Sequence, residues 1–125
     1  MKEFKDDHDA IRAVIQDYFE GVSGANTAPL ERAWESSAGH WKGIETDVAG
    51  YETVKVEPIF DSIERWAKGP TKDASGEVLS LEVIDGQIAI VKFDFQLGND
   101  RYLDILSLYK LNGEWKLINK MFVSR

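Results

Sequence analysis

The sequence contains no cysteine, only three prolines and two histidines, and no long apolar run. Without cysteine the chain can form no disulfide and offers no thiolate ligand, which fits a reducing compartment. The two histidines, His8 and His40, lie far apart, so we predict no metal site. No window approaches the roughly 20 apolar residues of a membrane helix, and the opening segment MKEFKDDHDAIRAV has no apolar run of signal-peptide length. These absences predict a soluble cytoplasmic protein with no membrane partner.

Positive charge is also scarce. The sequence has 15 lysines and arginines against 22 aspartates and glutamates, which gives a net charge of −7. An acidic surface repels phosphate backbones, so we expect no nucleic-acid partner. The sequence has no glycine-rich phosphate loop, nucleophile elbow or Ser/His/Asp arrangement, and we predict no cofactor. Its length and its 43% hydrophobic content predict one domain over residues 1–125 with a core of its own.

The first half of the chain shows mainly helical patterns. Apolar residues spaced by three and four, with capping residues and glycine or proline breaks, mark each helix. The predicted helices cover residues 6–22, Thr27–Ser36 with Thr27 as N-cap, and Pro58–Gly69. Two short strands are predicted between the second and third helices, at His40–Thr46 and Tyr51–Val56. Residues 69–77 are predicted to form a polar loop.

The last fifty residues, Gly76–Arg125, are typical of four strands joined by tight turns. Asp85-Gly86, Gly98-Asn99-Asp100 and Asn112-Gly113 separate runs rich in β-branched and aromatic residues. Helices followed by strands in this order predict an α+β fold with a curved antiparallel sheet. At Asp85-Gly86 a three-residue loop with a glycine bulge aligns the apolar residues of both strands better than a two-residue turn.

The register of the last two strands decides which residues point inward. A two-residue turn at Asn112-Gly113 places Leu108 opposite Leu117 and Asp104 opposite Met121, so that Asp104 and Asn119 share a face. In this register Lys120 and Phe122 point to the opposite face, whereas a bulge would reverse the assignment. Both faces are largely apolar, and too few helices are available to cover both. We therefore predict a homodimer in which a second copy of the chain covers the outer sheet face.

Two segments resemble the nuclear transport factor 2-like superfamily, also described as SnoaL-like or cystatin-like. They are IQDYFEGVSGANTAPLERAW and the ending LDILSLYKLNGEWKLINKMFV. The ending is most similar to the putative lumazine-binding subgroup, whose pattern matches here at Asp104, Leu106, Leu108, Lys110, Gly113, Trp115, Ile118 (shifted by one), Asn119 and Lys120. The resemblance implies a cone-shaped sheet packed against three helices from the N-terminal half. It also implies a pocket whose ligand enters at the mouth that the helices leave open.

Polar and aromatic residues with suitable positions are candidates for this pocket. Tyr18 matches the place where the steroid isomerases of the superfamily carry an oxyanion-hole tyrosine. The resemblance places Lys42, not a carboxylate, near the position of the isomerase's general base. Asp104 lies among apolar residues of a strand, where a carboxylate must be paired, neutral or next to a wet cavity. The alternative for Asp104 is a structural pair with Lys120, Lys42 or Arg101.

His40 and Lys42 point to one face of the first predicted strand, and Trp41 points to the other. If the first face is inward, the two residues form a basic pair for an anionic ligand or proton transfer. If it is outward, they are solvated and Trp41 is buried. The tryptophans can line the pocket or simply fill the core. The predicted ligand-binding residues are Tyr18, Trp34, His40, Trp66, Asp104 and Asn119.

Three functions fit these features. The first is a homodimeric domain that binds a small apolar or aromatic molecule. The second is an isomerase, dehydratase or cyclase whose catalytic residues are Asp104 or His40 as general acid or base and Tyr18 as hydrogen-bond donor. The third is a structural dimerisation module whose cone is filled by side chains. The size of the cavity distinguishes the third from the other two.

Overall fold

A computed structural model describes residues 6–70 and 73–125 of the chain. Residues 1–5 and residues 71–72 of the predicted polar loop lie outside the described part. The helices are α1 (Asp7–Ser23), α2 (Thr27–Ala33) and α3 (Ile63–Trp66), with the 3₁₀ turn η1 at Ile59–Asp61. The strands are β1 (His40–Thr46), β2 (Glu52–Pro58), β3 (Ala74–Ile84), β4 (Ile88–Leu97), β5 (Asp100–Leu111) and β6 (Glu114–Ser124).

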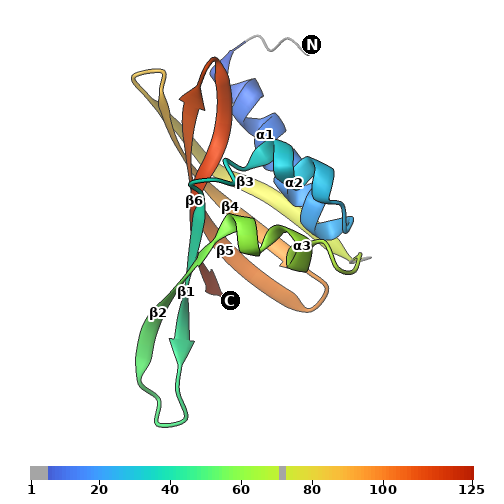
Figure 1. Cartoon of the computed structure of the whole chain (residues 1–125), viewed down its shortest axis with the longest axis vertical. Coiled ribbons are helices and arrows are strands. Elements are labelled where there is room, and N and C mark those ends of the chain that lie inside the picture. Colours follow the sequence, from blue (N-terminus) through green and yellow to red (C-terminus); the bar gives the residue numbers. More distant parts are fainter. Residues whose placement is uncertain (1–5, 71–72) are drawn as a thin grey trace.

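One curved sheet with helices on one of its faces forms the fold (Figure 1). Its strand order is β2-β1-β6-β5-β4-β3. All neighbouring pairs are antiparallel except β1 and β6, which run parallel, so the predicted antiparallel sheet is mixed at this one junction. The far end of the β1–β2 hairpin projects beyond the helices (Figure 1). Among the described residues no helix is both long and apolar enough to cross a membrane.

The first helix agrees with its sequence pattern. The side chain of Asp6 caps the helix by accepting a hydrogen bond of 2.9 Å from the backbone N–H of Asp9. Its apolar stripe turns Ile11, Ile15 and Tyr18 into the core, where each is almost fully buried. This stripe places the Tyr18 side chain beneath the concave face of the sheet.

The second and third helices are shorter than predicted. Asn26, not Thr27, caps α2, and the helix ends at Ala33 because Trp34 becomes extended and bridges Leu117 of β6. The predicted helix from Pro58 to Gly69 is divided into η1 and the single turn α3. The Ser62 hydroxyl lies between these two pieces and bonds the Glu57 carboxylate and the Pro58 carbonyl, which helps to anchor the break.

The β3–β4 hairpin has the predicted three-residue loop. Ile84 pairs with Ile88 across Asp85-Gly86-Gln87, and Asp85 and Gly86 both have positive φ. Contrary to the predicted loop over 69–77, β3 already begins at Ala74. A bulge between Val78 and Ser80 shifts the register, so that Leu79 is exposed instead of pointing into the core with Leu81.

The β5–β6 hairpin contains the most consequential correction. The two-residue turn at Asn112-Gly113 is confirmed, and Leu108 lies opposite Leu117 as predicted. Beyond that pair the register shifts by one residue, because Ile118 is an extra residue in β6.

As a result of this shift, Asp104 lies opposite Phe122 instead of Met121. Lys120 and Phe122 therefore point inward, and Asn119 and Met121 point outward, which reverses the prediction. The adjacent apolar residues Leu117 and Ile118 break the alternation of β6, and this break is the signal for the bulge.

The core lies between the helices and the inner face of the sheet. Its buried residues come from the helices α1, α2 and α3, from η1, from Trp34 and Trp41, and from alternate positions of β4, β5 and β6. A ring of aromatic contacts surrounds Tyr18, whose ring centroid lies 5.5 Å from that of Phe95 and 6.0 Å from that of Trp34. The core thus ends in an aromatic lining, and the candidate site lies beside it.

Candidate functional site

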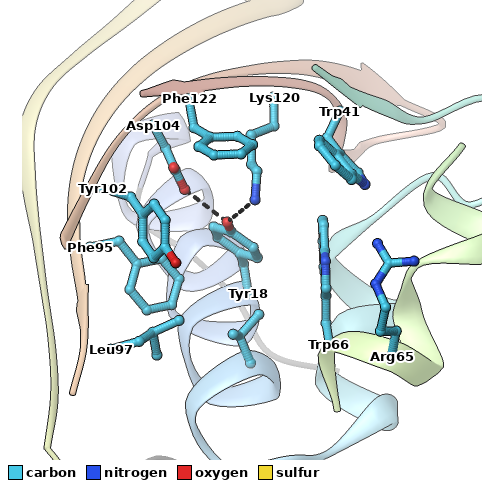
Figure 2. A pocket seen from close by; sticks show the side chains of 11 residues that line it. Tyr18, Trp41, Arg65, Trp66, Phe95, Leu97, Tyr102, Asp104, Lys120 and Phe122 are labelled. Atoms are coloured by element: carbon cyan, nitrogen blue, oxygen red, sulfur yellow. Dashed lines mark hydrogen bonds between the residues drawn. The ribbon is translucent and has the colours of Figure 1, made fainter. Parts of the chain in front are cut away.

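A cavity of about 240 Å³ opens between the sheet and helices α1 and α3. Figure 2 shows Asp104, Tyr102 and Phe95 on one side of it and Trp41 and Trp66 on the other. Tyr18 and Lys120 lie between these two sides. The lining residues are Tyr18, Val22, Trp41, Arg65, Trp66, Phe95, Leu97, Tyr102, Asp104, Lys120 and Phe122. The pocket is therefore largely aromatic, with a small group of polar atoms at one place.

Three polar side chains meet in this pocket through the hydroxyl of Tyr18. The hydroxyl donates a hydrogen bond of 2.8 Å to Oδ2 of Asp104 and accepts one of 3.0 Å from Nζ of Lys120 (Figure 2). Tyr18 comes from α1, Asp104 from β5 and Lys120 from β6, so the cluster exists only in the folded chain. We call these three residues the polar triad.

Burial controls the protonation of the polar triad. Asp104 is 1% exposed, and burial raises the pKa of its carboxyl, while the Lys120 charge and the Tyr18 hydrogen bond act in the opposite direction. Burial also lowers the pKa of the Lys120 amine, against the influence of Asp104. The pKa of Tyr18 lies well above its ordinary value, because burial and the neighbouring Asp104 both disfavour the phenolate. Burial therefore disfavours the charged forms of Asp104 and Lys120 and keeps Tyr18 neutral.

Aromatic rings surround the Lys120 amine. Nζ lies 4.3 Å from the ring centroid of Trp66, 5.1 Å from that of Phe122 and 5.4 Å from that of Tyr18. Trp41 completes the group at 6.0 Å. The negative faces of such rings favour a cation, so they offset part of the cost of burying the amine.

The structure brings three of the six predicted ligand-binding residues to the pocket. Tyr18, Trp66 and Asp104 line it, and the inward placement of Asp104 agrees with a pocket role. Trp34 is 2% exposed and lies behind this lining, with its ring centroid 6.0 Å from those of both Tyr18 and Trp66. Trp34 is thus a core residue that supports the lining.

The other two predicted residues, His40 and Asn119, do not line the pocket. Trp41 is buried and points inward, so its neighbours His40 and Lys42 take the opposite face of β1. Nδ1 of His40 lies 2.9 Å from the carbonyl oxygen of Ala38, and Asn119 accepts a hydrogen bond of 2.6 Å from Lys42. The structure therefore gives no support to His40 as a catalytic group, and the bulge at Ile118 removes Asn119 from the cavity.

Sequence reasoning missed Lys120, Tyr102, Phe122 and Arg65 as pocket residues. The sequence pattern predicts Lys120 only as a structural partner of Asp104, whereas in the structure the hydroxyl of Tyr18 lies between the two. Arg65 lies at the rim, where it forms an ion pair of 2.6 Å with Glu57. The absence of a side chain at Gly43 leaves room for the Phe122 ring, because a Cβ atom at Gly43 would lie only 2.9 Å from that ring.

Comparison with solved structures agrees with this fold. A protein of unknown function from Shewanella baltica OS155, described as NTF2-like, has 20% identity and a TM-score of 0.83, with 100% of this chain and 98% of that chain covered. A cystatin-like domain of unknown function from Nostoc punctiforme PCC 73102 has 12% identity and a TM-score of 0.72, with 98% and 80% covered. A ketosteroid isomerase-like protein from Erwinia carotovora atroseptica SCRI1043 has 13% identity and a TM-score of 0.68, with 97% and 98% covered.

These likenesses define an α+β protein with the NTF2-like, or cystatin-like, fold. Residues 6–123 match the family described as "Putative lumazine-binding", and the chain belongs to this family. No match was found among curated proteins.

Proposed function

We propose that this protein binds a small, flat, aromatic molecule in the pocket of the polar triad. The observation that carries the proposal is a buried group of hydrogen-bonding atoms on one side of an otherwise aromatic cavity. Ligand sites commonly combine apolar walls with a few polar groups that set orientation. The cavity of about 240 Å³ exceeds the roughly 150 Å³ that accommodates benzene in an engineered cavity. This size favours a ligand of about two fused rings over a structural module with a filled cone.

The polar triad suits a ligand with both carbonyl oxygens and ring N–H groups. Lys120 has three N–H donors, of which one bonds Tyr18, and Asp104 contacts Tyr18 through Oδ2 and has a second oxygen to offer. Lumazine, a bicyclic ring with carbonyl and N–H groups, has this chemistry, and the family description supports it as the first probe. Stacking between aromatic side chains adds to such binding without strict specificity.

Replacing Trp66 with Ala is expected to weaken lumazine binding by about tenfold or more, because stacking on an aromatic side chain contributes about 1–3 kcal/mol. Titration of lumazine into the protein, followed by isothermal calorimetry, measures this change. Phe60→Ala is the matched control, since Phe60 belongs to the neighbouring turn η1 but is 75% exposed and does not line the pocket. Equal affinity in wild type and Trp66→Ala, or no binding by either, would contradict the proposed site.

A second candidate function is catalysis by Asp104, as in an isomerase, dehydratase or cyclase. The specific observation in its favour is the hydrogen bond between Tyr18 and a carboxyl whose pKa burial raises, because a general acid or base works best near the operating pH. Tyr18 would then act as hydrogen-bond donor to the substrate. Turnover of a carbonyl substrate that disappears in Asp104→Asn would support this alternative.

We also propose that the protein forms a homodimer through the outer face of β1, β2, β5 and β6. This face carries a hollow of about 250 Å³ lined almost entirely by apolar atoms of residues such as Ile44, Val54, Leu103 and Met121. Ile44 is 57% and Val54 66% exposed, which is unusual for adjacent large apolar residues on a free surface.

Replacing Val54 with Glu is expected to convert this dimer to monomer, because an isologous interface would receive the buried charge twice. Sedimentation at micromolar concentration measures the change. Phe60→Glu, at an exposed apolar position of η1 that does not line this hollow, is the matched control. A wild-type protein that sediments as a monomer refutes the dimer and leaves the binding site unaffected.

A further inference from the structure

We propose that Lys120 is a covalent binding site whose amine forms a reversible Schiff base with an aromatic aldehyde or ketone held in the pocket. The inference rests on the proposed function, because it concerns the same cavity. It goes further by assigning the reacting atom, Nζ of Lys120, and the reacting group of the ligand, a carbonyl carbon.

The placement of Lys120 is the first argument. It is the one residue with a primary amine among the described residues that line the pocket, and its position on β6 between paired strands holds the backbone firmly. Four aromatic rings lie within 6.0 Å of its Nζ atom, so a flat ligand between these rings would lie beside the amine. Such proximity converts a slow encounter of amine and carbonyl into an intramolecular step.

The contacts of Lys120 differ from those of a structural lysine. Lys110, elsewhere on the sheet, forms a direct ion pair of 3.1 Å with Asp7. Within the described part of the chain, Lys120 forms no such direct pair, and its amine reaches Asp104 only through the Tyr18 hydroxyl. A hydroxyl in this place can accept a proton from one neighbour while it donates its own proton to the other.

The polar triad can thereby generate the neutral amine that the reaction needs. The Lys120 ammonium gives a proton to the Tyr18 oxygen, and the Tyr18 proton moves to Asp104, which leaves a neutral amine, a neutral tyrosine and a carboxylic acid. Burial moves the equilibrium towards this uncharged form, since it lowers the pKa of Lys120 and raises that of Asp104, while the attraction between the two charges opposes it. Desolvation of a lysine in an apolar pocket is a known way to activate it as a nucleophile.

The reaction balances with the groups present. The Nζ lone pair of neutral Lys120 attacks the carbonyl carbon, the C–N bond forms, and one nitrogen proton moves to the carbonyl oxygen to give a carbinolamine. Asp104 then supplies its proton, through Tyr18, to the carbinolamine hydroxyl, which leaves as water. The products are a protonated Schiff base, water and the Asp104 carboxylate, with no change in oxidation state. The iminium cation takes the place of the ammonium among the same aromatic rings.

Reductive trapping tests the inference on the full chain. The protein is incubated with 2-naphthaldehyde and sodium cyanoborohydride, and the adduct is located by intact mass and peptide mapping. We expect one adduct at Lys120, formed about tenfold or more faster than at the exposed Lys92, because the pocket holds the aldehyde beside the amine. Asp104→Asn keeps an acceptor for Tyr18 but lacks the proton, so we expect its trapping rate to fall by on the order of a hundredfold.

Lys120→Arg is the control for the reacting atom, because it keeps a long cationic side chain but has no primary amine. It should lose the adduct, whereas Phe60→Ala, which lies outside the pocket lining, should keep both the adduct and the binding of lumazine. If naphthaldehyde and lumazine bind to wild type but labelling is spread over surface lysines, the covalent inference is wrong and the proposed binding function stands. If neither molecule binds to the wild-type protein, both are wrong.

Discussion

Replacing Lys120 with Met is expected to lower the free energy of unfolding by about 3 kcal/mol at pH 7, because loss of one partner leaves a buried charge uncompensated. Asp104 is 1% exposed, and among the described residues Lys120 is the cation whose influence opposes the rise of the Asp104 pKa. Methionine has about the length of the lysine stem and keeps the contacts with the aromatic rings. The loss of stability is therefore due mainly to the missing charge. Urea unfolding of both proteins measures the difference.

The difference in free energy of unfolding between wild type and Lys120→Met is expected to depend on pH. In Lys120→Met the pKa of Asp104, already raised by burial, rises further because the lowering influence of the lysine is lost. The folded state then holds a proton that the unfolded state, with a pKa of about 3.9, releases. Protonated Asp104 therefore adds to the free energy of unfolding of the variant below the pKa that Asp104 has in the unfolded chain. This addition is lost as the pH rises through the pKa that Asp104 has in the folded protein. The deficit of the variant relative to wild type should shrink as pH falls from 7.5 towards 4.5.

The double variant Lys120→Met/Asp104→Asn is the control for this argument. It removes both charges and keeps an amide oxygen that can accept the Tyr18 hydrogen bond. We expect it to recover most of the stability that Lys120→Met loses, and its stability should vary less with pH in the acid range. A double variant whose loss is the sum of the two single losses would show that Lys120 and Asp104 are not coupled.

Replacing Trp34 with Ala is expected to lower the free energy of unfolding by about 3–5 kcal/mol, through lost burial and the cavity left behind. Trp34 is 2% exposed and lies against both Tyr18 and Trp66. Its loss should therefore also loosen the pocket wall and weaken lumazine binding. Chemical denaturation measures the first effect, and calorimetric titration of the folded variant measures the second.

Trp34→Phe separates packing from hydrogen bonding. The indole Nε1 of Trp34 has no hydrogen-bond partner among the described residues, so its removal costs no such bond. Trp115→Phe is the matched variant, because Nε1 of Trp115 donates a bond of 3.0 Å to Asp7. We expect Trp34→Phe to be less destabilising than Trp115→Phe and much less than Trp34→Ala. A Trp34→Phe protein as unstable as Trp34→Ala would mean that ring volume is not what Trp34 supplies.

The polar triad explains why binding and stability are linked in this protein. Tyr18 and Asp104 are buried, Lys120 is partly buried, and hydrogen bonds join the three, so a variant that removes one affects the fold as well as the pocket. The surrounding rings also contribute both to the packing of the fold and to the pocket, since Trp66 contacts Tyr18 and Trp34 and also faces the cavity. For this reason each proposed binding experiment is paired with a variant outside the lining or with a conservative change.

Much of the fold could be predicted because it depends on local patterns. The apolar stripe of α1, the strand at His40–Thr46 and the turn at Asn112-Gly113 each follow from residues close together in the sequence. The shorter helices could not be predicted in the same way. Trp34 leaves its helix to pair with Leu117, a partner 83 positions further along the chain by the difference 117 − 34.

The sequence by itself determined an α+β chain with a helical first half, a strand-rich second half, and Tyr18 and Asp104 in apolar surroundings. Only the tertiary structure decided what joins them. A single extra residue, Ile118, turns Lys120 inward and Asn119 outward, because side chains alternate along a strand and one added residue exchanges its two faces. The hydrogen bonds of the polar triad span 86 and 102 positions of sequence, distances over which local patterns carry no information.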